Sequence, residues 1–297
     1  PPGQSTRAAQ ALSRALGDSQ YEVRMEALRA IERLLHGRLL GQSEAQQLLG
    51  PVLLRVEDEH VGVRRAAAAA LGRLSPLPMP PELLRRAVVA LLGRLSDSAR
   101  DVRAEALTSL TALGASEAAP AALRLLQDAA EDVRRQALLY LGRVAYAPAV
   151  PLIIESFESG ADALRPQAAQ ALAAIAATGK MPASGEALKS LLAALGKEEL
   201  RPLSRQGLLT VGAVAAPLAL GRLHQGASGQ VEVGALVDLL RDLGAQSDAK
   251  KALPAAVRKQ VSDELYAELR RGRLPREQVV DALAAQCEPS SAQLLVG

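Results

Sequence analysis

The sequence predicts an all-α protein, a right-handed α-solenoid of stacked antiparallel helix pairs. Three observations predict this class. Aromatic residues make up 2% of the 297 residues and Trp is absent, so a core must be filled by Leu, Ala and Val. Ala is the strongest helix former, and the scarcity of β-branched runs argues against a sheet. The third observation is a short motif that recurs along the chain.

The recurring motif is Val-Arg, followed by Ala at the fourth residue after the Val and by apolar residues at the fifth and eighth. Clear copies begin at Val23, Val63, Val102 and Val133, looser copies at Leu164 and Val231, and a partial copy at Leu200. The partial copy has Ser204 and Arg205 where Ala and an apolar residue are expected. These offsets fall on one face of a 3.6-residue helix, so each copy marks one amphipathic helix.

Successive copies lie 31 to 40 residues apart, which leaves room for a second helix in each unit. These additional helices are predicted at residues 43–56, 80–95, 117–127, 148–157 and 184–195. A two-helix unit cannot bury its apolar face alone, so the units must stack. We expect about seven helix-pair units over residues 1–245, the first helix covering 6–16. Degenerate helices at 257–271 and 276–286 are expected to cap the same solenoid within residues 246–297.

Turn residues agree with these boundaries. Four motif copies have an Asp five residues before the Val, where a carboxylate can cap a helix: Asp18, Asp58, Asp97 and Asp128. Gly72, Gly114 and Gly142 come near helix ends, as expected for C-terminal caps or tight exits from the helix. Prolines fall at expected helix starts or in first turns, where the missing N–H costs little: Pro80, Pro148, Pro166, Pro182, Pro202 and Pro275.

The pattern Asp-x-x-x-x-Val-Arg-x-x-Ala-Leu/Ala-x-x-Leu-Gly resembles the bacterial HEAT-like repeat, which is also found in phycobilin lyase subunits. Residues 63–72 and 132–142 carry the resemblance most clearly. It covers residues 10–245 and weakens after residue 175. The resemblance implies the solenoid fold. It does not imply one function, because members of this family bind many different molecules.

The charge balance excludes a strongly basic surface over the whole protein. The net charge is +3, with 19 Arg against 16 acidic residues in the first 150 residues and 16 basic against 16 acidic afterwards. A general nucleic-acid or membrane binder would show a one-sided field. No apolar run approaches the roughly 20 residues of a membrane span.

The compartment stays open. The single cysteine, Cys287, allows no intramolecular disulfide, so the fold does not require an oxidising compartment. The chain begins without Met, which we interpret as a fragment or a processed form. A cytoplasmic location is favoured over an exported or lipid-anchored form, and the excess of Arg over Lys suggests a bacterial source.

Two basic features are candidate anion sites. The Arg residues of the six motif copies that carry one form the first: Arg24, Arg64, Arg103, Arg134, Arg165 and Arg201. It would be either a stripe for phosphates or acidic peptides, or a set of ion pairs with the Asp of the same or the neighbouring unit. The regular register favours ion pairs. The second is a C-terminal group interleaved with acidic residues: Lys250, Lys251, Arg258, Lys259, Arg270, Arg271, Arg273 and Arg276.

No catalytic, cofactor or metal site is predicted. The histidines, His36, His60 and His224, lack the spacing of metal ligands, and a helix-end or capping role suits the first two better. Cys287 has no recognisable His–Asp partners. The glycine-rich stretch 226–229 lacks the Lys and the preceding strand of a phosphate-binding loop.

The favoured hypothesis is therefore a non-enzymatic, protein-binding scaffold or adaptor that uses the concave face lined by the motif helices. Candidate partner-binding residues are Arg65, Glu105, Arg135, Gln136, Arg270, Arg271, Arg273 and Arg276. The partner is expected to be another protein. One alternative is a subunit of a lyase-like heteromer, which only the resemblance suggests. The other is nucleic-acid binding through the C-terminal basic group, which the shortage of aromatic residues for base stacking argues against.

Overall fold

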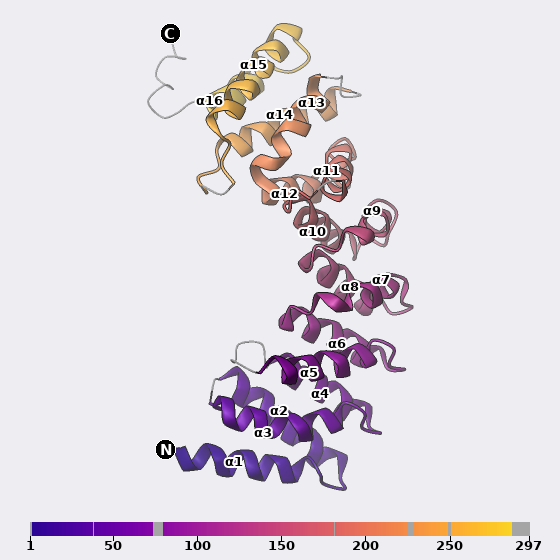
Figure 1. The fold of residues 1–297 in the computed structure, drawn as a ribbon. Helices are drawn as coiled ribbons and strands as arrows, with labels where there is room; N and C mark the ends of the chain where they lie inside the picture. The colour runs from indigo at the N-terminus through magenta and orange to yellow at the C-terminus, as the bar shows by residue number, and fades with distance from the viewer. Residues whose placement is uncertain are drawn as a thin grey trace. The chain divides into compact units, whose positions relative to one another are not determined.

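A computed structural model describes residues 2–37, 39–73, 80–180, 182–224, 229–248 and 251–286. These residues form helices and turns, with no strand among them, and the helices stack as antiparallel pairs (Figure 1). The predicted fold class is confirmed. Cys287, Lys250 and the stretch 226–228 lie outside the described residues.

Unit 1, Pro1–Val144, is compact and holds four helix pairs. The first helices of these pairs are α1 (Pro2–Ala15), α3 (Gln42–Arg55), α5 (Pro81–Arg94) and α7 (Ala119–Arg124). The second helices are α2 (Tyr21–His36), α4 (Val61–Gly72), α6 (Arg100–Leu113) and α8 (Glu131–Arg143). Short 3₁₀ turns, η1 (Ser116–Ala118) and η2 (Leu125–Gln127), flank α7.

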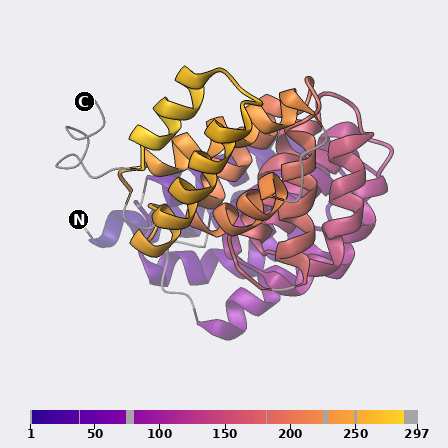
Figure 2. The same ribbon diagram turned by 90° about the horizontal axis from the view of Figure 1, so that it is seen from above.

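Unit 2, Ala145–Gly297, is the other compact part of the chain. Its first helices are α9 (Val150–Glu158), α11 (Ala183–Ala194), α13 (Ala216–His224) and α15 (Ala255–Arg271). Its second helices are α10 (Arg165–Ala176), α12 (Arg201–Val211), α14 (Gln230–Gly244) and α16 (Arg276–Ala284). The turn η3 (Ala147–Ala149) precedes α9, and η4 (Gly212–Ala215) joins α12 to α13. The last pair, α15 and α16, is yellow in Figure 2 and packs side by side.

The motif residues form the core of each pair. In α6, for example, Val102, Ala106, Leu107 and Leu110 are completely buried. Within each unit, neighbouring second helices contact each other more extensively than neighbouring first helices do. Because the first helices are further apart, each unit curves with its second helices on the inner side. We call the exposed side chains of the second helices the second-helix face of that unit.

A repeated ion pair joins neighbouring pairs in unit 1. Arg64 donates from Nε and Nη2 to the two carboxylate oxygens of Asp97, in the loop of the next helix pair, at 2.8 and 2.9 Å. Its Nη1 donates to the backbone carbonyls of Asp58 and Glu59, in its own loop, at 2.9 and 3.0 Å. One guanidinium therefore bridges two successive loops. We call this arrangement the inter-repeat ion pair.

The same geometry recurs on both sides. Arg24 binds Asp58 at 2.9 and 2.8 Å, and Arg103 binds Asp128 at 2.8 and 2.7 Å. Each Asp also caps its helix by accepting from the backbone N–H two residues later. The predicted pairing of motif Arg with Asp is confirmed for these three copies. The stripe interpretation fails for them, because their guanidinium groups are largely buried and already bound.

These carboxylates have lowered pKa values. Burial by itself raises the pKa of Asp97, but the hydrogen bonds from Arg64 and from the Ala99 amide, with the charges of Arg64 and Arg94, outweigh it. The pKa of Asp97 therefore lies below its usual value. The same balance lowers the pKa values of Asp58 and Asp128.

In unit 2 the motif Arg side chains have other partners. Arg165 pairs with Asp162 at 2.6 Å and with Glu199 at 3.5 Å, and both carboxylates are exposed. Arg201 donates to the Leu195 carbonyl at 3.0 Å. The inter-repeat ion pair thus joins a motif Arg to the motif Asp of the following repeat. Arg134, in the last full motif copy, has Ser159 at that position of the following repeat and donates to the Asp128 and Ala129 carbonyls of its own loop at 2.7 and 3.0 Å.

Two of the three predicted glycine caps have a different role. Gly114 adopts φ +67° and ends α6 in the left-handed conformation, as predicted. Gly72 is instead the last residue of α4, where an added Cβ would lie 2.6 Å from Ser109 Oγ and 2.9 Å from Ser109 Cα on α6. Gly142 is likewise buried within α8. The position of a glycine near a helix end in the sequence therefore did not show whether the glycine forms a turn or allows two helices to pack closely.

One helical stretch, Arg201–His224, has the length and hydropathy to cross a membrane, whereas the sequence predicted no apolar run of that length. It is not one regular helix, because α12 ends at Val211 and Gly212 adopts φ +71°. Its helices pack against α10, α11 and α14, and 44% of the apolar stretch is buried.

Replacing Arg64 by Ala should destabilise the protein by about 3 kcal/mol, because it leaves the Asp97 carboxylate buried without its main partner. The matched control is the neighbouring Arg65→Ala. Its side chain is 58% exposed, so its loss should cost under about 1 kcal/mol. Urea unfolding followed by circular dichroism measures both, and equal effects would contradict the assigned role of the inter-repeat ion pair.

Acid should weaken unit 1. A carboxyl group with a lowered pKa in the folded state contributes stability that is present above its unfolded pKa of about 3.9 and is lost as the pH falls through the folded value. The urea concentration at the unfolding midpoint should therefore decrease when the pH is lowered below about 4. In Arg64→Ala this midpoint should depend less steeply on pH. A wild-type midpoint that is constant through this range would overturn the prediction.

Gly72→Ala should cost about 1–3 kcal/mol, because the new methyl group overlaps Ser109 on α6. Gly93→Ala in α5 is the control, since its Cβ would meet no atom within 4 Å. That change should stabilise by about 0.5 kcal/mol through helix propensity. Thermal unfolding should show a lower melting temperature for Gly72→Ala and a higher one for Gly93→Ala. A stabilising Gly72→Ala would disprove the close-packing explanation.

Candidate partner-binding surface

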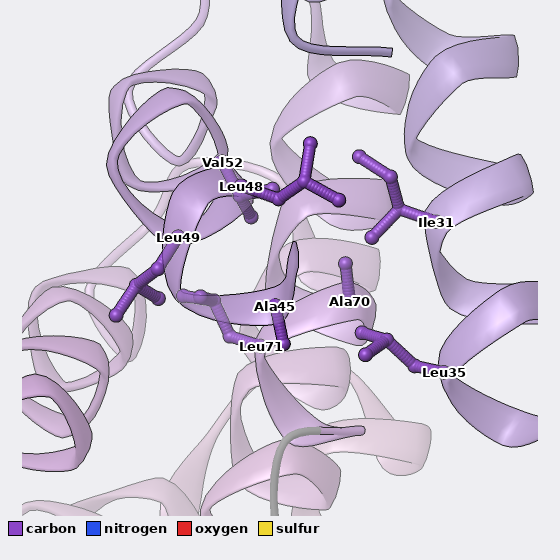
Figure 3. A pocket seen from close by; sticks show the side chains of 8 residues that line it. All are labelled: Ile31, Leu35, Ala45, Leu48, Leu49, Val52, Ala70 and Leu71. Carbon is purple, nitrogen blue, oxygen red and sulfur yellow. The ribbon is translucent and has the colours of Figure 1, made fainter. Parts of the chain in front are cut away.

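The enclosed cavity in unit 1 is a packing gap and not a binding site. It lies between α2, α3 and α4 (Figure 3). Its lining is buried and apolar: Ile31, Leu35, Ala45, Leu48, Leu49, Val52, Ala70 and Leu71. Its volume of about 10 Å³ barely equals that of one water probe, and no polar side chain lines it to hold a water.

On unit 1, two of the predicted partner-binding residues contact each other. Arg65 on α4 lies 3.5 Å from Glu105 on α6, with side-chain exposures of 58% and 22%. Burial raises the pKa of the Glu105 carboxyl, and the charge and hydrogen bond of Arg65 only partly oppose it. A second cross-helix pair, Arg73 with Glu32 at 3.2 Å, lies on α4 and α2. Ion pairs therefore bridge neighbouring helices across this second-helix face.

The next two predicted residues lie on α8. Arg135 donates to Glu131, one turn earlier in the same helix, at 2.8 Å, and Gln136 is half-buried. Pairs of this kind on a surface stabilise a protein by at most about 1 kcal/mol. A partner could therefore displace them at little cost.

The C-terminal basic group is partly used inside the fold. Arg271 and Arg273 both donate to Glu268, whose side chain is completely buried, and Arg271 also donates to Glu264 at 2.8 Å. Arg270 and Arg276 are exposed. The structure therefore separates the four predicted C-terminal residues into two that neutralise a buried carboxylate and two that face solvent.

Unit 2 has open grooves on its second-helix face. The first, of about 340 Å³, lies between α10 and α12. Its lining is small or uncharged: Pro166, Ala169, Gln170, Ala173, Leu203, Gln206, Gly207 and Thr210. The small side chains leave the space open, and the exposed amides and hydroxyl offer donors and acceptors at its edge.

The second groove, of about 510 Å³, lies on the other side of the same helix, between α12 and the end of α14. Its lining is more polar: Pro202, Arg205, Gln206, Leu209, Thr210, Asp242, Gln246 and Lys251. Gln206 and Thr210 line both grooves, so these exposed side chains form the ridge between them.

The third groove, of about 330 Å³, joins the start of α12 to α14 and α16. It is lined by Arg201, Gln230, Val231, Gly234, Ala235, Asp238, Leu274, Pro275 and Gln278. Together the three grooves reach all four second helices of unit 2.

None of the eight candidate partner-binding residues lines these grooves, but two residues of the candidate anion sites do, Lys251 in the second groove and Arg201 in the third. A further signal was the poor motif copy at Leu200–Leu208, which could mean a kink, a partner site or a degenerate repeat. The structure shows a continuous α12 with no kink. Ser204, buried where Ala is expected, donates to the Leu191 carbonyl, and Arg205 pairs with Asp242 across the second groove.

Other predicted side chains have structural roles. His60 caps α4 by accepting from the Gly62 amide at 3.2 Å and stacks on Tyr21 at 3.7 Å, while His36 ends α2. Tyr140 and Phe157 are completely buried and so cannot stack on bases. Among the residues that the structure describes, no group of three or more His, Cys, Asp or Glu side chains could hold a metal ion.

Residues 88–173 match the family of HEAT repeats. No curated protein matches the chain. Among solved structures, Kap121p is similar with a TM-score of 0.59 and 17% identity, over 96% of this chain and 36% of Kap121p. Kap121p bound to Pho4p is similar with a TM-score of 0.53 and 14% identity, over 95% of this chain and 33% of that one.

Two other solved structures also resemble this chain. A designed armadillo repeat protein in complex with the peptide (KR)4 has a TM-score of 0.51 and 19% identity, over 68% of this chain and 98% of that one. The CpcE–CpcF complex of phycocyanin lyase from Nostoc has 21% identity over 86% of this chain and 94% of that one, but its TM-score of 0.48 supports no inference. The similarities to Kap121p and the designed protein concern the fold. This chain is therefore an all-α solenoid protein of stacked antiparallel helix pairs that contains HEAT repeats over residues 88–173.

Proposed function

We propose that this protein is a binding scaffold that holds a segment of another protein along the second-helix face of unit 2. The observation that carries the proposal is the succession of three open grooves across α10, α12, α14 and α16. Small side chains form parts of their lining, and exposed amide, hydroxyl and charged groups stand at their edges. Such a lining suits a polypeptide better than a small substrate, which needs an enclosed pocket.

The dimensions suit an extended segment. Packed helices lie about 8–10 Å apart, and an extended chain advances about 3.3 Å per residue. A segment that crosses the second helices therefore meets a new helix about every three residues. Exposed Gln170 and Gln206 stand on successive helices and can donate to and accept from its backbone.

The structural relatives support a binding role. One was solved with a peptide and another with a protein partner. The candidates Arg65, Glu105, Arg135 and Gln136 on unit 1, and the exposed Arg270 and Arg276 on unit 2, remain additional partner-contact residues in this proposal. The proposal assigns binding and no catalysis to the chain.

Site-specific photo-cross-linking tests which surface is used. A benzophenone amino acid at Gln206, on the ridge between two grooves, should give adducts with a protein in extract of the native cells. The same probe at Lys189, exposed on the first helix α11, should give none. Gln206→Trp should then weaken binding of the cross-linked partner by about tenfold or more, because the indole fills the grooves. Adducts at Lys189 but not at Gln206, or at neither position, would reject this face.

A further inference from the structure

The acidic side chains of the second and third grooves are already neutralised by the protein. The Asp242 carboxylate accepts from Arg205 Nε at 2.8 Å on one oxygen and from Arg241 Nε at 3.3 Å on the other. Asp238 accepts from Arg241 Nη1 at 3.2 Å and from Gln278 Nε2 at 3.1 Å. Both oxygens of Asp242 are bound to guanidinium groups, so this carboxylate has little capacity left for a basic ligand, while Asp238 receives both of its bonds on Oδ1 and shares its charge with Arg241.

The cation Lys251 of the second groove is, in contrast, available. It lines this groove, beside Arg205 and Asp242, and it is only partly exposed. Among the described residues it has no ion pair within 4.0 Å. Arg201, in the third groove, uses Nε to bind the Leu195 carbonyl, and none of its nitrogens forms an ion pair with a described residue. The grooves therefore carry surplus positive charge.

The backbone of Lys251 is held in place. Gly212 adopts φ +71°, and a Cβ on it would lie 2.9 Å from the Cα of Lys251. The Ala213 amide donates to the Lys251 carbonyl at 3.1 Å. Both contacts involve backbone atoms, so they fix where the Lys251 side chain starts without depending on what that side chain is. A cation on a fixed stem loses less freedom on binding than one on a mobile loop.

From these observations we infer that the grooves of unit 2 select an acidic partner: an extended peptide segment that places an Asp or Glu carboxylate against Lys251. This inference rests on the proposed function and adds the charge of the bound segment to it. Arg201 adds positive charge at the opposite end of α12. Basic segments are disfavoured, because Asp238 and Asp242 are occupied and the remaining charges repel them.

The test uses the full chain as bait for a displayed library of random dodecapeptides. Peptides selected by the wild type should be enriched in Asp and Glu over the unselected library. Lys251→Glu should abolish or reverse this enrichment, while Lys189→Glu, the same charge change at an exposed position on α11, should leave it intact. Circular dichroism checks that both variants fold, which the backbone character of the Lys251 contacts leads us to expect.

Fluorescence anisotropy of the best selected acidic peptide measures how much Lys251→Glu changes its affinity. Lys251→Glu should weaken its affinity at least about fivefold, the equivalent of one exposed ion pair, and added salt should weaken wild-type binding. Neutral or basic selected peptides, an empty selection, or an equal effect of Lys189→Glu would each overturn the inference. The proposed function has its own test, because it fails if the probe at Gln206 gives no position-specific adduct. A failure of the acidic-partner inference can therefore be told apart from a failure of the proposed function.

Discussion

The arrangement of unit 1 depends on the geometry of one guanidinium group. An arginine in the second helix of a pair faces two loops at once, and its planar fork matches a carboxylate on one side while its remaining N–H groups reach backbone carbonyls on the other. At Arg64 these bonds reach Asp97 in the loop of the next helix pair, and Asp58 and Glu59 in the loop of its own pair. The register between neighbouring pairs is thereby fixed at every step.

Such an ion pair is costly to break rather than strongly stabilising. Removing two charges from water costs about as much as their attraction returns, so the intact pair adds little net stability. Losing one partner leaves the other charged and buried. The Asp58 and Asp97 carboxylates meet this demand with three kinds of donor, namely the motif Arg, a further Arg and a backbone amide, and Asp128 meets it with the motif Arg and a backbone amide.

In both units neutral side chains also reach backbone carbonyls of neighbouring helices. Ser109 reaches Ala68 in unit 1. In unit 2, Ser204 reaches Leu191, Gln246 reaches Leu209, and Gln286 reaches Leu240. The second helices α10 and α12 meet through small residues such as Ala173 and Gly207, where a Cβ added to Gly207 would lie 3.5 Å from Ala173 Cβ. Small side chains at the contact leave space beside it, and the first groove occupies that space.

The sequence by itself determined the fold class and most helix positions. Buried apolar residues at offsets 0, 4, 5 and 8 leave no alternative to an amphipathic helix, and units of two such helices must stack to bury them. It also indicated the Arg–Asp pairing, because Arg64 and Asp97 keep the same register as Arg24 and Asp58. The prolines and Gly114 mark helix ends through local backbone geometry, which needs no knowledge of distant residues.

Only the tertiary structure decided which polar side chains are available to a partner. Arg271 and Arg273 resemble Arg270 and Arg276 in sequence, but a buried Glu268 binds the first two. Gly72 resembles Gly114, but it lies against Ser109 from a helix 37 residues later. The grooves beside Gln206 depend on how closely α10, α12 and α14 approach one another. The distance between helices is a sum of many side-chain contacts between residues far apart in the chain, so no local pattern contains it.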